Sequence, residues 1–196
     1  MTPIKIGVAG YMGCGKSTCA RYLSRNSGTI IDVDSFAKDM MNSNTKIKKK
    51  LAKSFGSNVL CKNRILFDVL GEIVFSSLQN LRTLNTIVHP PLLKRLHSKI
   101  TEYDNKLYIV DAALISYWKI EEWFDILFWI ETSEEMQLRR LAGKTAVTSE
   151  ELKKRIKLQR ELFVQPKEGK WIAISNEGTL SEFKESIEKK NPMNIK

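Results

Sequence analysis

The sequence predicts an α/β protein built on a parallel sheet of five strands with helices on both faces. Five short apolar runs, rich in β-branched or aromatic residues, have the length and composition of buried strands. Helical stretches separate these runs, and strands that alternate with helices join through right-handed crossovers into a parallel sheet. The expected strands span residues 4–9, 29–33, 106–110, 126–130 and 171–174.

One of the stretches between strands, from residue 45 to residue 101, is far longer than a single crossover helix requires. It therefore predicts a helical subdomain over the strand ends, and ligands of open parallel sheets bind at the carboxyl ends of the strands. The remaining expected helices span residues 16–25, 35–41, 133–142, 149–162 and 181–189.

We expect a single domain. A chain of 196 residues buries about 70% of its unfolded surface in one core and leaves no room for a second full domain. The helical subdomain covers about 42–101, and an Arg- and Lys-rich segment at about 139–159 is expected to form a short lid. The expected core comprises residues 1–41, 102–138 and 160–190.

The chain is basic. Lys and Arg outnumber Asp and Glu by 32 to 22, which gives a formal net charge of +10. Such a charge favours polyanionic partners, among them nucleotides, coenzyme phosphates and nucleic acid. Charge alone does not choose among these partners.

The cysteines and the apolar runs indicate the compartment. Cys14, Cys19 and Cys61 form no Cys-x-x-Cys pair, and an odd number cannot close a disulfide framework, which fits a reducing environment. No apolar run approaches the roughly 20 residues of a membrane helix, and residues 1–10 begin as a strand rather than as a signal segment. We expect a cytoplasmic protein with no membrane partner and no zinc site.

The segment from Gly10 to Ser17 reads Gly-Tyr-Met-Gly-Cys-Gly-Lys-Ser and satisfies the pattern G-x-x-x-x-G-K-[ST] between a strand and a helix. Glycines let the backbone turn its N–H groups around a phosphate, and the following helix directs its positive dipole end at the same anion. Lys16 is expected to reach the β- and γ-phosphates, and the Ser17 hydroxyl to ligate Mg²⁺. The pattern therefore predicts a P-loop NTPase fold that binds ATP.

Six residues of this segment are the expected nucleotide ligands: Gly13, Cys14, Gly15, Lys16, Ser17 and Thr18. A glycine-rich turn without a ligand is the alternative, which the order of strand, loop and helix disfavours. We interpret Cys14 and Cys19 as small space-filling residues rather than nucleophiles.

Carboxylates follow two of the expected strands. Asp32 and Asp34 end the second strand, and its alternation directs both to one face. Either can accept the proton of an attacking hydroxyl or order the metal, with Asp34 better placed, and the alternative role is to cap the helix that begins near Ser35. Asp111 follows the third strand and either organises Mg²⁺ or caps a turn.

A P-loop followed by Asp-x-Asp at the second strand resembles the dephospho-CoA kinase family, and further segments agree. The Leu-Asn and His-Pro of residues 84–90 resemble that family's pattern, as does the Asn-x-Gly turn within 174–180. Residues 137–141 resemble the start of its lid, and Arg155, Ile156 and Gln159 resemble the end of it. The matches run in order from about residue 4 to residue 183.

This resemblance implies an enzyme that phosphorylates the 3′-hydroxyl of dephospho-CoA with ATP, the final step of coenzyme A synthesis. Asp34 would orient and deprotonate that hydroxyl, while His89, Leu114 and the helical subdomain would contact the acceptor. Arg140 and Arg155 would close over the phosphates. The resemblance places Asn176 in a turn beside the adenine. Without the resemblance, His89 reads equally as a helix-boundary residue, and the arginines as a solvated helix face.

The chain departs from the family pattern at three places. Residues 111–118 lack the usual proline and carry aromatics where an acid is expected, which puts acceptor contacts there in doubt. Lys144 stands for the second lid arginine, and it keeps the charge without the bidentate geometry. Lys170 and Trp171 replace the usual Ala-Asp before the Asn-x-Gly turn.

Three alternatives stay open at this point. The first is another small-molecule kinase of the same fold, acting on a nucleoside, a nucleotide or shikimate. The second is a nucleotide-dependent switch or nucleic-acid-stimulated ATPase, which the charge of +10 suggests. The chain lacks an Asn-Lys-x-Asp motif and a basic stripe interleaved with aromatics, so we expect no nucleic-acid partner. The third is an inactive nucleotide-binding protein. We expect a monomer or a small homo-oligomer.

Overall fold

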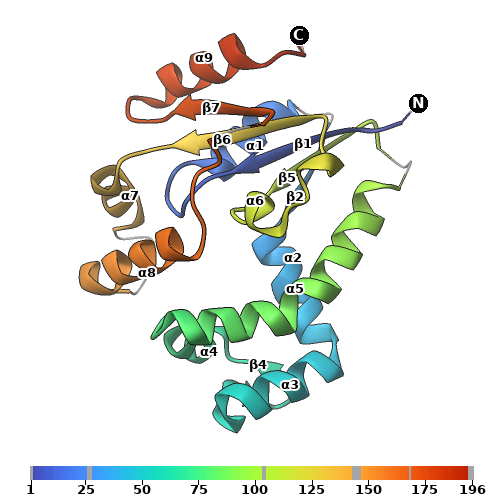
Figure 1. Ribbon diagram of the computed structural model, residues 1–196, viewed down its shortest axis with the longest axis vertical. Helices are drawn as coiled ribbons and strands as arrows, with labels where there is room; N and C mark the ends of the chain where they lie inside the picture. The colour runs from blue at the N-terminus through green and yellow to red at the C-terminus, as the bar shows by residue number, and fades with distance from the viewer. Residues whose placement is uncertain (1, 26–27, 103–104, 143–146, 168, 194–196) are drawn as a thin grey trace. The chain divides into compact units, whose positions relative to one another are not determined.

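The computed structural model describes residues 2–25, 28–102, 105–142, 147–167 and 169–193, and it contains the predicted five-stranded sheet. The strand order is β2-β5-β1-β6-β7, and every neighbouring pair is parallel (Figure 1). The predicted α/β fold is therefore confirmed, with strand bounds within two residues of those expected. The strands are β1 (Ile4–Ala9), β2 (Thr29–Asp32), β5 (Leu107–Asp111), β6 (Ile126–Glu131) and β7 (Trp171–Ser175).

The chain divides into two compact units. Residues 1–32 and 102–196 form the first, here called the core unit, which contains the sheet. Residues 33–101 form the second, here called the helical unit. The expected helical subdomain, about 42–101, falls within the helical unit.

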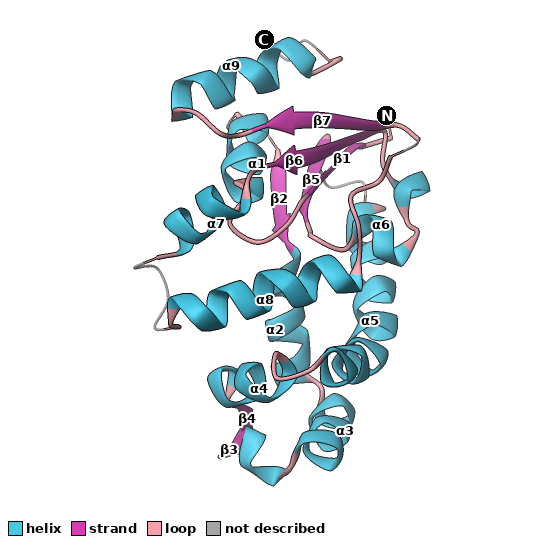
Figure 2. Cartoon of the chain, turned by 60° about the vertical axis from the view of Figure 1, so that its left-hand side comes forward, coloured by secondary structure: helices cyan, strands magenta, loops and turns pink. Residues whose placement is uncertain are grey.

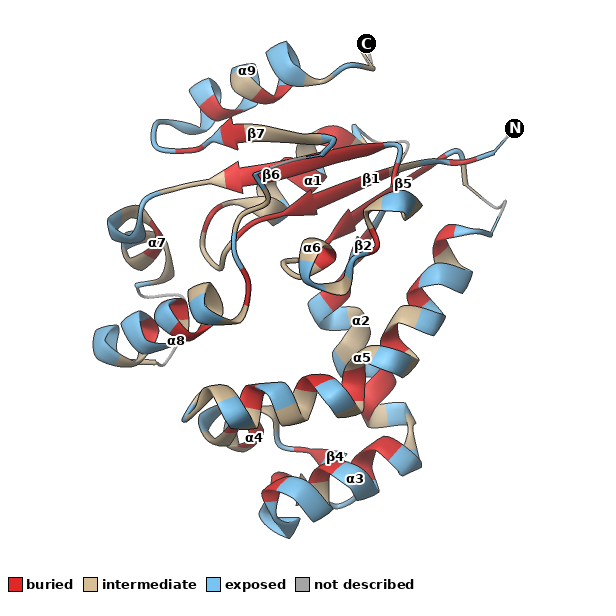
Figure 3. Cartoon of the chain, in the orientation of Figure 1, coloured by how far each residue is buried: buried red, intermediate tan, exposed pale blue. Residues whose placement is uncertain are grey.

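Helices cover both faces of the sheet in the core unit. Ile6 and Val8 of β1 pack in one buried cluster with Cys19 of α1 and Phe183 of α9, so these two helices cover one face. Gly7 points to the opposite face, where a Cβ would lie 2.9 Å from Ile115 of α6. Figure 3 shows the central strands as the most buried part of this unit. The helices are α1 (Lys16–Ser24), α6 (Ile115–Trp118), α7 (Glu134–Leu141), α8 (Ser149–Leu162) and α9 (Leu180–Lys190), with a 3₁₀ turn η2 (Glu121–Trp123).

The helical unit contains four helices and a small hairpin that the sequence did not predict (Figure 2). Lys62 and Asn63 have positive φ angles of 45° and 62°, which is the geometry of a two-residue hairpin turn. The Lys48 ammonium group is buried and donates to the Asn63 carbonyl at 2.9 Å, so it ties this turn to α3. The elements are α2 (Val33–Ser43), α3 (Thr45–Phe55), the 3₁₀ turn η1 (Ser57–Val59), β3 (Leu60–Cys61), β4 (Arg64–Ile65), α4 (Phe67–Val74) and α5 (Leu78–Ile100).

Helix α5 continues through Pro90 and Pro91. A proline inside a helix removes a donor and pushes on the preceding turn, which bends the helix without necessarily ending it. Figure 1 shows α5 changing direction near its middle. His89 therefore lies inside a helix, and its interpretation as a helix-boundary residue is wrong.

The second strand ends earlier than expected. β2 stops at Asp32, and α2 begins at Val33, so Asp34 lies in the first turn of a helix. The prediction that strand alternation sends Asp32 and Asp34 to one face is therefore wrong. The strand ends at Asp32 because its pairing with β5 ends there, at the pair formed by Asp32 and Asp111.

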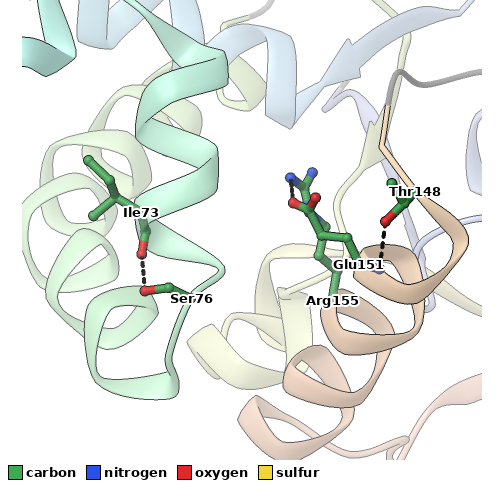
Figure 4. A network of polar contacts seen from close by, with 5 residues as sticks. All are labelled: Ile73, Ser76, Thr148, Glu151 and Arg155. Carbon is green, nitrogen blue, oxygen red and sulfur yellow. Dashed lines mark hydrogen bonds and ion pairs between the residues drawn. The ribbon is translucent and has the colours of Figure 1, made fainter.

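Side-chain caps set several helix ends. Thr148 accepts a hydrogen bond from the Glu151 amide at 3.3 Å and begins α8, which also carries an ion pair between Glu151 and Arg155 (Figure 4). After α4, the Ser76 hydroxyl donates to the Ile73 carbonyl at 2.7 Å.

Within the residues described, no helix is both long and apolar enough to cross a membrane.

The capping box of α9 gives a stability prediction. Thr179 accepts from the Glu182 amide at 3.3 Å, and the Glu182 carboxylate accepts from the Thr179 amide at 2.7 Å. Replacing Thr179 by Ala should lower the free energy of unfolding by about 1 kcal/mol, because one amide of the first turn loses its acceptor. Urea-induced unfolding measures the change. Ser181→Ala, an exposed substitution in the same turn, should leave the midpoint unchanged, and equal losses in both variants would contradict the assignment.

Candidate active site

The loop between β1 and α1 has the backbone shape that its glycines predict. Gly10, Gly13 and Gly15 have φ angles of 143°, 73° and 108°, a region that side chains rarely allow. A Cβ on Gly15 would lie 2.3 Å from Nδ2 of Asn176, so the third glycine also makes room for a neighbouring strand end. Both requirements explain why the sequence uses glycine here.

Two polar side chains at the end of the loop have partners, one in the loop itself and one at the sheet edge. Nζ of Lys16 donates to the Tyr11 carbonyl at 3.2 Å, so the ammonium group lies folded back over the loop. Oγ of Ser17 donates to Oδ2 of Asp111 at 2.6 Å, and Asp111 is buried. Asp32 pairs with Asp111 across neighbouring strands. A hydroxyl and two carboxylates therefore gather where β2 and β5 end.

A pocket of about 430 Å³ opens beside the loop, within the size range of small-ligand sites. Its lining comes from the loop, from α1, from α7 and from the segment that follows β7. Most of the nucleotide ligands expected from the sequence lie here together: Gly13, Gly15, Lys16, Ser17, Thr18, Arg140 and Asn176. The pocket also includes Arg21, Leu180 and Phe183, which the sequence analysis did not single out.

Asn176 and Arg140 hold the loop from the side of the pocket. The buried Asn176 amide donates to the Cys14 carbonyl at 2.7 Å. Arg140 donates to the Asn176 carbonyl at 2.9 Å, to its Oδ1 at 3.1 Å and to the Cys14 carbonyl at 3.3 Å. Both side chains therefore donate to the carbonyl of Cys14 while they line the pocket.

The other basic residues expected in a lid differ from Arg140. Arg155 forms an ion pair with Glu151 on its own helix and does not line the pocket among the described residues. Lys144, expected to replace the second lid arginine, lies outside the described residues.

The two buried thiols agree with a packing role. Burial raises the pKa of the Cys14 thiol, against the opposing effect of Lys16, and burial likewise raises the pKa of Cys19. Both thiols therefore stay protonated near neutral pH, and a protonated thiol is a poor nucleophile.

The residues expected to contact an acceptor are divided between the units. Asp34, in α2, and His89, in α5, belong to the helical unit, whereas Leu114 directly precedes α6 in the core unit. The Asp34 carboxylate is exposed, and its place in the first turn of a helix favours a negative charge. Burial lowers the pKa of His89 from 6.5 to about 4, so its imidazole is neutral at physiological pH.

Hard oxygen ligands are available for a divalent cation. Mg²⁺ prefers hydroxyl, carboxylate and water oxygens, and Ser17, Asp111 and Asp32 supply the first two kinds at one sheet edge. Among the residues that the structure describes, no three His, Cys, Asp or Glu side chains form a metal cluster. One hydroxyl and two carboxylates suit Mg²⁺, which keeps several waters when it binds to a protein.

The parallel sheet, the glycine loop after its first strand and the basic pocket beside that loop together define a P-loop kinase. The model of the dephospho-CoA kinase family matches residues 4–182, nearly the whole chain. The chain therefore belongs to the dephospho-CoA kinase family.

Individual relatives agree with this family. The dephospho-CoA kinase of Carboxydothermus hydrogenoformans is 31% identical over 186 residues, which cover 93% of this chain and 90% of that protein. Among solved structures, a Thermus thermophilus protein has a TM-score of 0.77 at 23% identity, with both chains covered completely. The dephospho-CoA kinase of Campylobacter jejuni has a TM-score of 0.60 at 23% identity, with 96% of each chain covered. These two structures agree with the fold.

His89 gives a prediction on pH. Since burial lowers its pKa from 6.5 to about 4, the unfolded chain binds more protons between these values than the folded chain does. The contribution of a neutral His89 to the free energy of unfolding is therefore complete above pH 6.5 and is lost as the pH falls toward 4. The free energy of unfolding should therefore fall less in the His89→Gln variant than in the unsubstituted protein between pH 7 and pH 4.5. Urea-induced unfolding at both pH values measures the difference.

A matched control is His97→Gln, which changes an exposed histidine of the same helix and should retain the pH dependence of the unsubstituted protein. Nuclear magnetic resonance should find no protonation of His89 above about pH 5. A His89 imidazole that titrates near pH 6.5 would contradict the assignment.

Proposed function

We propose that this protein transfers the γ-phosphoryl group of MgATP to the 3′-hydroxyl of dephospho-CoA, the last step of coenzyme A synthesis. The observation that carries the proposal is the glycine loop with its basic pocket in a chain of the dephospho-CoA kinase family. A relative such as the Carboxydothermus hydrogenoformans protein bears that enzyme's name.

The loop pocket is the proposed ATP site. The amides of the loop and of the first turn of α1 offer donors to the phosphates, and Lys16 adds a positive charge that can leave the Tyr11 carbonyl for a phosphate oxygen. Thr18 and Asn176 line the same pocket and are proposed to contact the nucleotide, with Arg140 above it.

Ser17, Asp111 and Asp32 are the residues proposed to hold Mg²⁺, Ser17 through its hydroxyl and the carboxylates directly or through water. A magnesium ion bound there would neutralise charge on the β- and γ-phosphates. The short contact between Ser17 and Asp111 supports this assignment, because both oxygen atoms lie where the loop meets the sheet edge.

The helical unit is proposed to bind the acceptor. Asp34 is the proposed base that orients the 3′-hydroxyl and accepts its proton, with His89 and Leu114 as acceptor contacts. Its exposure leaves the Asp34 carboxylate accessible to a substrate. A neutral His89 can donate one hydrogen bond and accept another, which suits a hydroxyl or amide of the acceptor.

In this reaction the side chains of the protein supply little covalent chemistry. Phosphoryl transfer is accelerated mainly by alignment of the hydroxyl with the phosphorus and by neutralisation of charge. In this proposal Lys16 and Arg140 supply positive charge, Asp34 aligns the hydroxyl, and the lid at about 139–159 excludes water that would otherwise hydrolyse ATP.

A coupled assay of ADP release tests the function. Purified protein with MgATP should release ADP quickly when dephospho-CoA is present and only slowly without it, because a kinase needs its acceptor. A nucleoside panel and shikimate serve as alternative acceptors, and Lys16→Ala serves as the inactive control. Turnover that depends on one of those alternatives, or on nucleic acid, would reject the proposed acceptor.

The role of Asp34 gives a second prediction. Asp34→Asn keeps the size of the side chain but removes the base, so kcat should fall by about 10²–10⁴-fold. The dissociation constant for MgATP should stay unchanged, because the ATP pocket lies in the core unit.

Asp39→Asn is the matched control, since Asp39 is an exposed carboxylate of the same helix. It should retain the kcat of the unsubstituted protein. Full activity in Asp34→Asn would move the proton acceptor to another residue.

A further inference from the structure

The tip of the glycine loop, residues Tyr11 and Met12, is held from outside the pocket by side chains of α7 and α8. The Met12 amide donates to Oε1 of Gln159 at 2.8 Å. The Met12 carbonyl accepts from Nε2 of Gln137 at 2.8 Å. Both backbone groups of Met12, its N–H and its carbonyl, are therefore bound by side-chain amides from two different helices.

A third residue, Arg160, contacts both Gln137 and the ring of Tyr11. The guanidinium carbon of Arg160 lies 4.7 Å from the centre of the Tyr11 ring, and NH2 of Arg160 donates to Oε1 of Gln137 at 3.0 Å. Gln137 is fully buried, so its two hydrogen bonds to Met12 and Arg160 are shielded from water. Gln137 and Arg160 are hydrogen-bonded to each other, and Gln159 joins them through the backbone of Met12. These three residues are here called the loop latch.

Two aromatic rings also pack against the ring of Tyr11. Its ring lies 5.4 Å from that of Trp129 and 5.2 Å from that of Phe163, measured between centroids. Trp129 is buried in β6, and Phe163 directly follows α8. The Tyr11 ring is thus packed against two aromatic rings and against the latch arginine.

We infer that the loop latch positions the glycine loop for ATP, so that Gln137, Gln159 and Arg160 are positioning residues of the phosphate site. Ordering a flexible backbone costs conformational entropy, and a loop with three positive-φ glycines has more freedom to lose than most. A latch that holds the tip before ATP arrives removes part of this cost from binding.

The latch residues also stand at both ends of the expected lid. Gln137 precedes the segment 139–159 in α7, whereas Gln159 and Arg160 lie at its end in α8. The loop tip is therefore supported by side chains of both α7 and α8.

This inference rests on the proposed ATP site but not on the identity of the acceptor. Its test is a direct measurement of MgATP binding, for example by calorimetry, which needs no acceptor. A wild-type protein that binds ATP without making coenzyme A would reject the proposed function and leave the test of the latch intact.

Gln159→Met is the main variant, because Met keeps the length of a half-exposed side chain and removes the acceptor for the Met12 amide. The dissociation constant for MgATP should rise about five- to tenfold, the factor expected for the net loss of one hydrogen bond. Gln159→Glu restores an acceptor oxygen and should recover most of this affinity. The KM for ATP should follow the dissociation constant, while the KM for dephospho-CoA stays unchanged.

Gln165→Met is the matched control. Gln165 is also half-exposed and follows the same helix, but its amide donates to Glu131 and not to the loop. Unchanged ATP affinity in Gln159→Met, or an equal loss in the control, would overturn the inference. Arg160→Lys, which keeps the charge but loses the planar contact with Tyr11, tests the same point with a second residue and should also weaken ATP binding.

Discussion

The carbonyl of Cys14 is the group on which the phosphate site depends. A loop that turns its amides toward a ligand turns carbonyls away, and these carbonyls need donors because they lie in a buried region. Asn176 supplies one donor from the end of β7, and Arg140 supplies another from α7. The third glycine is required by the same contact, since any side chain at position 15 would collide with Asn176. The end of the edge strand β7 and helix α7 therefore shape a loop that is distant from both in sequence.

Two groups in the loop have partners that a ligand could replace. Lys16 donates to the loop carbonyl of Tyr11, and Ser17 donates to Asp111. An ammonium group bound to a neutral carbonyl gains less than one bound to a phosphate oxygen, because a hydrogen bond between two charged groups is stronger. Lys16 can therefore exchange its carbonyl partner for a phosphate oxygen at little cost.

Much of the fold could be predicted from the sequence because its signals are local. Each strand is a short apolar run, and the glycine motif lies where a strand gives way to a helix. The end of β2 could not be predicted, since it is set by pairing with Asp111. The hairpin at residues 60–65 has strands of only two residues, too short for any periodicity. The support of the loop by Gln137 and Gln159 joins residues 125 and 147 positions apart, and no local pattern encodes such contacts.

The positive charge of the chain is concentrated in the helical unit. Residues 33–101 contain twelve Lys and Arg against four Asp and Glu, so the helical unit carries most of the formal net charge of +10. A nucleic-acid-stimulated ATPase needs such charge for a long polyanion, whereas a kinase needs it for an acceptor that itself carries phosphates. If the acceptor is dephospho-CoA, as proposed, its diphosphate accounts for a basic helical unit without any nucleic acid. Salt screens this kind of attraction. Raising the ionic strength should therefore weaken the binding of the acceptor more than the binding of ATP, whose phosphates are held by directed donors of the loop.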